Sequence, residues 1–155
     1  FNLPHQINAT LPSILGDDTA HVLARAVQFF LPGEPQVYYV GLFNGKDDQG
    51  LFAKTEQGRD VNRHHYTPAE IDEAIASPVT QAILGLARLR KHAAFEGAFS
   101  WKQLTDSTME LQWTGKDSKL KLWFDLSGST PAFSIEITDG TSSRSLTSVS
   151  ELATI

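Results

Sequence analysis

The side chains best suited to chemistry gather in one polar segment, Gly58 to Tyr66, which reads GRDVNRHHY. Arg59 and Arg63 could hold an anion, because a guanidinium offers phosphate or carboxylate a planar fork of donors. The alternative is a solvated surface loop in which Arg59 pairs with Asp60. The residues alone leave both interpretations open.

The five histidines do not predict a metal site. His64 and His65 are adjacent, so on an extended backbone their side chains point to opposite sides and cannot bind one ion together. No two histidines have the spacing of helical metal ligands, and the chain has no cysteine to supply a thiolate. We expect His21 and His92 on helix surfaces, and we expect neither a metal nor another cofactor.

Other signatures of catalysis or of macromolecular partners are also missing. The paired carboxylates Asp17-Asp18, Asp47-Asp48 and Asp72-Glu73 are better explained as a helix cap, a turn and the first turn of a helix. No G-x-S-x-G motif or glycine-rich phosphate loop occurs. A formal charge of -5 argues against a nucleic-acid partner, and no apolar run is long enough to cross a membrane.

The first 92 residues are expected to combine helices with one buried strand. A helix over 17–31 has an aspartate cap, one apolar face and a Pro-Gly stop. Residues 36–43, QVYYVGLF, predict a strand that is apolar on both faces, followed by a long loop over 44–66. The TPAE sequence at 67–70 predicts a capped helix, and Ser77-Pro78 begins another that continues to 92. The expected buried faces of the first and last helices are Val22, Ala26, Phe29 and Phe30, and Val79, Ala82, Ile83, Leu86 and Leu89.

The pattern changes after His92 to an alternation of apolar and polar residues, which predicts an antiparallel meander with one face in water. Turn sequences separate the alternating runs, and a last short strand is expected near residues 143–149. Alternation places Trp101 and Trp113 in the core. Trp123 is out of phase and is the candidate for an exposed or interface side chain.

The buried strand predicted over 36–43 has no partner of its own kind in residues 1–92. A central strand without neighbours would leave its backbone N–H and C=O groups unpaired. We therefore expect the end of a larger α/β domain whose other strands lie upstream, in agreement with a chain that begins at Phe1 rather than Met. The rival interpretation is a compact α+β domain in which this strand joins the meander.

The stretch AVQFFLPGEPQVYYVGLFNGKDD at 26–48, followed by the polar segment at 58–66, resembles sucrose phosphorylases of the α-amylase superfamily. The resemblance continues through 68–92 and more weakly into the strands, and it covers roughly the C-terminal third of such an enzyme. It implies α/β plus all-β architecture. Residues 1–92 would be the C-terminal portion of a (β/α)8 TIM barrel with two active-site loops, 1–16 and 44–66, and residues 93–155 would be a C-terminal antiparallel β-sheet domain.

The resemblance also implies an activity. The family transfers a glucosyl unit to phosphate with retention, through a covalent glucosyl-enzyme on an Asp and with a Glu as acid and then base. Those carboxylates would lie upstream, so this chain alone would be inactive. Arg59 matches the arginine that binds the glucosyl unit or phosphate, and Gln6 matches a glutamine that contacts sugar. His5 falls where a phosphate-binding tyrosine is usual.

The first loop departs from the family, because Asn2-Leu3-Pro4-His5-Gln6 stands where Leu-Asp-Leu-Tyr-Gln is usual. The change suits a donor such as sucrose 6'-phosphate or a glucosylglycerol-type compound rather than plain sucrose. A hydrolase or transglucosylase of the same superfamily is an alternative, as is a noncatalytic carbohydrate-binding or structural module. The expected partners are a sugar and inorganic phosphate in the cytoplasm, and a homodimer is one assembly that the resemblance allows.

Overall fold

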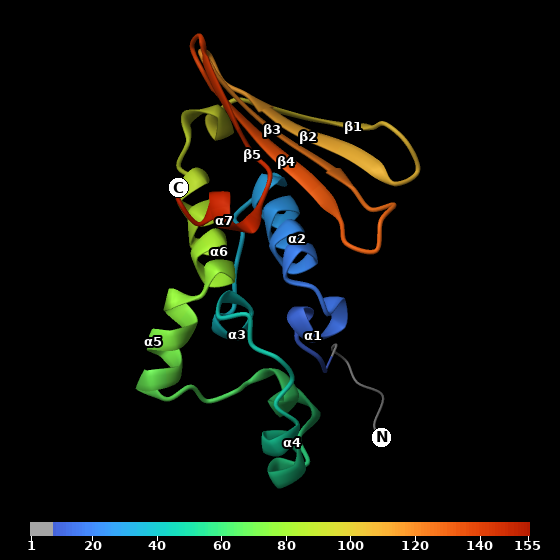
Figure 1. Cartoon of the computed structure of the whole chain (residues 1–155), viewed down its shortest axis with the longest axis vertical. Coiled ribbons are helices and arrows are strands. Elements are labelled where there is room, and N and C mark those ends of the chain that lie inside the picture. The colour runs from blue at the N-terminus through green and yellow to red at the C-terminus, as the bar shows by residue number, and fades with distance from the viewer. Residues whose placement is uncertain (1–7) are drawn as a thin grey trace.

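The computed structural model describes residues 8–155, in which helices occupy the first part and one sheet most of the second (Figure 1). The helical elements in chain order are α1 (Leu11–Leu15), α2 (Asp18–Phe30), α3 (Tyr39–Leu42), α4 (Gln49–Thr55), the 3-10 turn η1 (Gly58–Asn62), α5 (Pro68–Ala76), α6 (Pro78–Leu89) and the 3-10 turn η2 (Ala93–Glu96). The strands are β1 (Ala98–Gln103), β2 (Thr108–Thr114), β3 (Ser118–Asp125), β4 (Ala132–Asp139) and β5 (Ser142–Leu146), and α7 (Val149–Leu152) follows them.

Helix α2 forms where the sequence predicts it. The Asp17 side chain caps it by accepting a hydrogen bond from the Ala20 N–H at 2.7 Å. The helix ends at Phe30 and Leu31 is its C-cap, directly before Pro32. The predicted apolar face of this helix is buried throughout.

The pair α5 and α6 is also confirmed, with a break between them. Thr67 and Glu70 form a reciprocal capping box at the start of α5, which satisfies two free backbone donors. Ser77 ends α5 and caps α6, and Pro78 occupies the first turn, where a missing N–H costs no hydrogen bond. All five residues of the predicted apolar stripe on α6 are buried.

The sheet is the predicted meander, with strand order β1-β2-β3-β4-β5 and every pairing antiparallel. Helix α2 lies against β2 and β3, and α6 packs on α2, so one face of the sheet is covered and the other is open (Figure 1). A row of paired residues, Leu111, Leu122 and Ile135, is buried on the covered face. A single hydrophobic cluster joins these strands to the two helices.

The prediction of a strand over 36–43 is wrong. Tyr39–Leu42 form one helical turn instead, and among the described residues no strand lies beside it. The turn bonds its own backbone, since the Leu42 N–H donates to the Tyr38 carbonyl at 2.9 Å and the Phe43 N–H to that of Tyr39 at 3.0 Å. Periodicity does not separate a short buried strand from a buried helical turn. The rival fold, in which this segment joins the meander, is not observed either.

Three other expectations need correction. His21 is fully buried rather than on a helix surface, and its ring contacts Asn44 and Arg25. The segment 44–66 is not a continuous loop, since α4 and η1 lie within it. Trp101 is 63% exposed although it alternates with core residues, because β1 is an edge strand and its outer end extends past the helices (Figure 1).

No helix in residues 8–155 has the length and apolar character needed to span a bilayer.

Candidate functional site

The polar segment singled out by its sequence lies at the end of the molecule remote from the sheet, around α4 (Figure 1). An open pocket of about 480 Å³ forms there, between the residues that follow α3 and those that precede α5. Its walls mix polar and apolar surface and come from two stretches of chain. They are Phe43, Gly45, Lys46, Asp47, Asp48, Gln49, Gly50, His64 and Tyr66.

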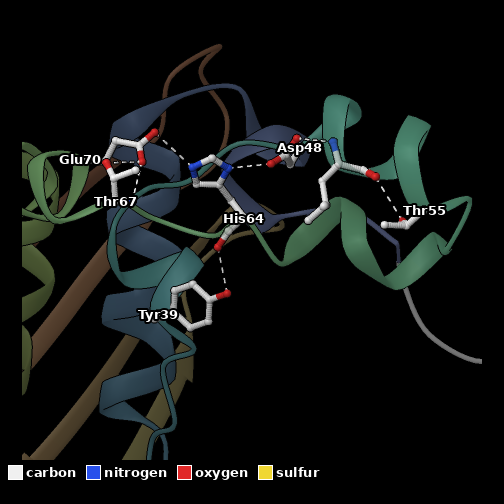
Figure 2. Close-up of polar contacts among 7 residues, drawn as sticks. Tyr39, Asp48, Thr55, His64, Thr67 and Glu70 are labelled. Carbon is white, nitrogen blue, oxygen red and sulfur yellow. Dashed lines mark hydrogen bonds and ion pairs between the residues drawn. The ribbon is translucent and has the colours of Figure 1, made fainter.

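His64 lies between two carboxylates at one wall of this pocket, as Figure 2 shows. Its Nδ1 is 2.6 Å from Asp48 Oδ2, and its Nε2 is 3.3 Å from Glu70 Oε1. Both carboxylates also cap helices: Asp48 accepts the Leu51 N–H of α4 at 2.7 Å, and Glu70 accepts the Thr67 N–H at 2.7 Å. The imidazole therefore joins the starts of α4 and α5.

The electrostatics follow from this geometry. The hydrogen bond with Asp48, and more weakly that with Glu70, raises the pKa of His64 above its usual value. The hydrogen bond with His64 and the Leu51 N–H lower the pKa of Asp48. The Thr67 N–H and hydroxyl lower the pKa of Glu70, with a smaller contribution from His64. The cluster thus favours a charged imidazolium between two charged carboxylates.

Other contacts hold the backbone around His64. The Asp48 N–H donates to the Val61 carbonyl at 2.7 Å, and the Tyr39 hydroxyl donates to the His64 carbonyl at 2.9 Å. The Tyr66 ring meets the imidazole edge to face, with centroids 4.6 Å apart. These contacts explain why the imidazole keeps both carboxylates in reach although its side chain is 32% exposed.

A second polar network supports the pocket from α2. His21 Nδ1 and Asn44 Oδ1 are 2.9 Å apart, and the Arg25 Nε–H donates to His21 Nε2 at 3.3 Å. Asn44 also donates to Asp18 Oδ1 at 2.8 Å. Asn44 adopts a positive φ of 55°, where the left-handed backbone needs such support. The network fixes where the chain leaves α3 and enters the pocket wall.

Arg59 lies outside the pocket, on η1, and projects into solvent. Its side chain is 57% exposed, and its Nε is 4.0 Å from Asp60 Oδ1. This surface pair matches the simpler of the two sequence interpretations, yet it leaves most of the guanidinium uncovered. His5 and Gln6, the other predicted substrate-binding residues, lie outside the described residues. The structure therefore does not show the three predicted residues together.

The chemistry available to the described residues is positioning and anion binding. Asp48 and Glu70 are committed to helix caps and to one imidazole, so they do not form a free acid/base pair. In the pocket wall, Lys46 donates from Nζ to the Pro12 carbonyl at 3.0 Å and keeps donors for another acceptor. Within residues 8–155, no group of three His, Cys, Asp or Glu side chains has metal-binding geometry.

The cluster of Asp48, His64 and Glu70 was missed at the level of sequence. Asp48 was expected in a turn, whereas it caps α4, and Asp47 accepts the Thr10 N–H at 2.6 Å. Glu70 was recognised only as half of a capping box. The signal available in the sequence was the capping pattern. Asp48 and Glu70 precede or begin helices on either side of His64, and carboxylates in such positions can accept hydrogen bonds from its two ring nitrogens.

Comparison with known proteins identifies relatives of this chain. It is 48% identical over 123 residues to the sucrose phosphorylase of Bifidobacterium adolescentis, covering 78% of this chain and 24% of that protein. It is 44% identical over 124 residues to the sucrose 6(F)-phosphate phosphorylase of Thermoanaerobacterium thermosaccharolyticum, covering 79% and 25%. The glucosylglycerol phosphorylase of Marinobacter adhaerens is 39% identical over 124 residues, with 79% and 26% covered. No protein-family model matches the sequence.

The fold has a relative among solved structures. The crystal structure of sucrose 6F-phosphate phosphorylase from Thermoanaerobacter thermosaccharolyticum superposes with a TM-score of 0.86 at 38% identity. The match covers 93% of this chain and 30% of that one. The chain thus spans about a quarter of the length of the curated relatives it matches.

The helices, the five-stranded sheet and these similarities make the chain similar to one part of proteins named as glucoside phosphorylases. More narrowly, it is similar to the C-terminal part of the sucrose phosphorylases, which confirms the resemblance seen in residues 26–48 and 58–66.

Proposed function

We propose that the intact protein transfers a glucosyl unit from sucrose or a related α-glucoside to phosphate, with retention. The observation that carries this proposal is the similarity over most of the chain to relatives named as glucoside phosphorylases, at 39–48% identity. The proposed partners are a small sugar and inorganic phosphate. A homodimer and a cytoplasmic location stay predictions.

The proposed reaction has two displacements. An Asp carboxylate attacks the anomeric carbon, the glycosidic C–O bond breaks, and a Glu donates a proton to the leaving oxygen. A phosphate oxygen then attacks the same carbon and displaces the Asp, while the Glu takes a proton back. Both carboxylates are expected upstream of this chain, so the chain on its own should not turn over substrate.

Arg59 is the described residue to which the resemblance gives a part in this reaction. Its guanidinium carries a permanent charge, and among residues 8–155 its ion-pair partner is Asp60, at the limiting distance of 4.0 Å. A phosphate could therefore engage its fork without displacing a buried partner. Gln6 is proposed to contact the sugar and His5 to lie near the phosphate, as the resemblance implies.

The architecture of the intact protein is part of the proposal. Residues 1–92 would supply the end of a (β/α)8 barrel, and residues 93–155 the C-terminal β-sheet domain. In support of this division, the helices α1 to α6 precede residue 93, and all the strands of the described chain follow it. The hydrophobic cluster contains residues from both sides of residue 93, so it would pack the two parts against each other.

The donor is proposed from the first loop. Leu3 and His5 stand where the family usually has an acidic residue and a tyrosine, which suits sucrose 6'-phosphate or a glucosylglycerol-type donor. The relatives include phosphorylases named for both kinds of donor. If water rather than phosphate consumes the substrate faster, the protein is a hydrolase or transglucosylase of the same superfamily.

The test is phosphorolysis by the intact protein that contains this chain. We expect release of glucose 1-phosphate from an α-glucoside, and a fall in kcat/KM for phosphate of about tenfold or more in Arg59→Ala. Arg144→Ala, on the exposed strand β5, is the matched control and should leave the rate unchanged. A wild-type rate in Arg59→Ala would remove Arg59 from the site, and absence of phosphorolysis with every α-glucoside would refute the activity.

A noncatalytic sugar-binding module is the second candidate, favoured by one observation. Trp101 exposes 63% of its surface on the edge strand, and an aromatic ring of this kind can stack on the apolar face of a sugar. Trp123, the residue expected for this role, is only partly exposed. Sugar-dependent quenching of fluorescence that is lost in Trp101→Ala but kept in Trp123→Phe would support this function over the first.

A further inference from the structure

The contact between Asp48 and His64 closes the base of a loop. The two side chains meet at 2.6 Å although they are 16 positions apart in the chain, and the backbone bond from Asp48 to Val61 runs beside them. The intervening residues form α4 and η1, and η1 carries Arg59. The second contact of His64, to Glu70, ties this base to the start of α5.

This junction requires a particular protonation state. Both ring nitrogens of His64 face carboxylate oxygens, and a carboxylate can only accept. A neutral imidazole has one N–H and would leave its other nitrogen facing an acceptor, whereas the imidazolium donates at both. The groups that face the ring are Asp48 from the start of α4, Glu70 from α5 and the uncharged phenol ring of Tyr66. Each charged neighbour is therefore anionic.

We propose that His64, in its doubly protonated form, is a positioning residue that latches the loop bearing Arg59 against α5 and thereby sets the anion affinity of Arg59. Deprotonation of His64 removes one donor, so one of the two carboxylates loses its hydrogen bond and the junction between the base of the loop and α5 loosens. The proposal rests on the anion-binding role of Arg59 proposed above. The new element is that anion binding by Arg59 is coupled to the protonation of His64.

The direction of the effect follows from linkage. The carboxylates raise the pKa of His64 in the closed loop, so the latch is closed below that raised pKa and opens as the pH rises through it. Residues 49–62 gain freedom when the base opens, and the entropy of ordering them then opposes anion binding. Coupling between proton and anion is reciprocal, so a bound anion also favours the protonated latch.

The first test measures the latch itself by hydrogen exchange of the full chain between about pH 6 and pH 9, corrected for intrinsic rates. We expect amides of residues 49–62 to lose protection as the pH rises in the wild type. His64→Gln should be unprotected at every pH, and His65→Gln, whose exposed side chain adjoins the latch, should behave as the wild type. Unchanged protection in His64→Gln would overturn the latch.

The second test measures anion binding to the same three proteins by calorimetry. Sulfate is the probe, because its charge stays constant over this range whereas phosphate itself titrates. We expect wild-type affinity to fall about fivefold or more on raising the pH, and His64→Gln to bind weakly with no such step. A pH step that persists in His64→Gln overturns the coupling. If sulfate binds at no pH while the exchange result holds, the latch stands but the anion role of Arg59, and the coupling with it, fails.

Discussion

The indole N–H of Trp113 donates to the backbone carbonyl of Phe30 at 2.6 Å and so joins strand β2 of the sheet to the last turn of α2. The bond is buried and spans 83 positions in the chain. The Phe30 carbonyl belongs to the last turn of a helix, where carbonyls have no partner within the helix. The side chain of Trp113 therefore satisfies a group that the helix cannot.

This bond predicts a stability change. Trp113→Phe keeps an aromatic ring in the core but leaves a buried carbonyl without a donor, and we expect the free energy of unfolding to fall by about 1–3 kcal/mol. Urea denaturation measures it. Trp101→Phe is the control, because Trp101 lies 63% exposed on the edge strand and should change stability by less than about 0.5 kcal/mol. Equal effects of the two substitutions would contradict the role given to the bond.

The buried His21 predicts sensitivity to acid. Burial, and then the charge of Arg25, lowers the pKa of His21 to about 4, against about 6.5 in the unfolded chain. The folded state therefore binds fewer protons, so this stabilisation is complete above the unfolded pKa and is lost as the pH falls from about 6.5 towards 4. The loss should be roughly 3 kcal/mol.

His21→Gln separates this contribution from the other acid groups. Unfolding free energies of both proteins at neutral pH and at about pH 4.5 should show a shallower decline in the variant, which carries no titrating ring. Parallel declines in the two proteins would mean that His21 does not drive the acid response.

The contact between α6 and α7 predicts a steric limit at Gly85. A Cβ at this position would lie 2.1 Å from the Leu152 carbonyl oxygen, so Gly85→Ala must push α7 away. We expect a loss of about 1–3 kcal/mol in thermal or urea unfolding. Gly50→Ala in α4 meets its nearest atom at 3.4 Å and should be neutral or stabilising, since alanine favours helix. A stable Gly85→Ala protein would show that α7 is not held against α6.

The ion pair of Lys121 and Glu136 predicts a small effect. The atoms are 2.7 Å apart across β3 and β4, yet both side chains are partly exposed. Water screens such pairs, so we expect a coupling energy below about 1 kcal/mol that shrinks further in high salt. A double-mutant cycle with Lys121→Met and Glu136→Gln measures it. A coupling of several kcal/mol that is insensitive to salt would contradict this expectation.

Much of the architecture was predictable because its signals are local. The capping box at Thr67, the aspartate cap before α2 and the alternation in the meander each act within a few residues. The segment 36–43 was not predictable in the same way. Its apolar run is compatible with a strand or a helical turn, and the choice depends on which neighbours are present.

The candidate site was predictable only in outline. The polar segment was recognised, and Arg59 was placed on it by resemblance, but the bridge from His64 to Asp48 and Glu70 depends on how three elements meet. His21 was misplaced for a related reason. From sequence alone, a histidine on an amphipathic helix is predicted to lie on the surface. The contacts of His21 with Asn44 and Arg25 come from distant or folded parts of the chain and are known only from the structure.

The strand order of the sheet has a consequence for the order of folding. Each strand pairs with its neighbour in the chain, so the sheet can form hairpin by hairpin, and such events take about 1–10 μs. The bond from Trp113 to Phe30 must instead close a loop of 83 positions, which costs more chain entropy. The meander is therefore expected to assemble early, with the docking of α2 as the slower step that locks sheet and helices together.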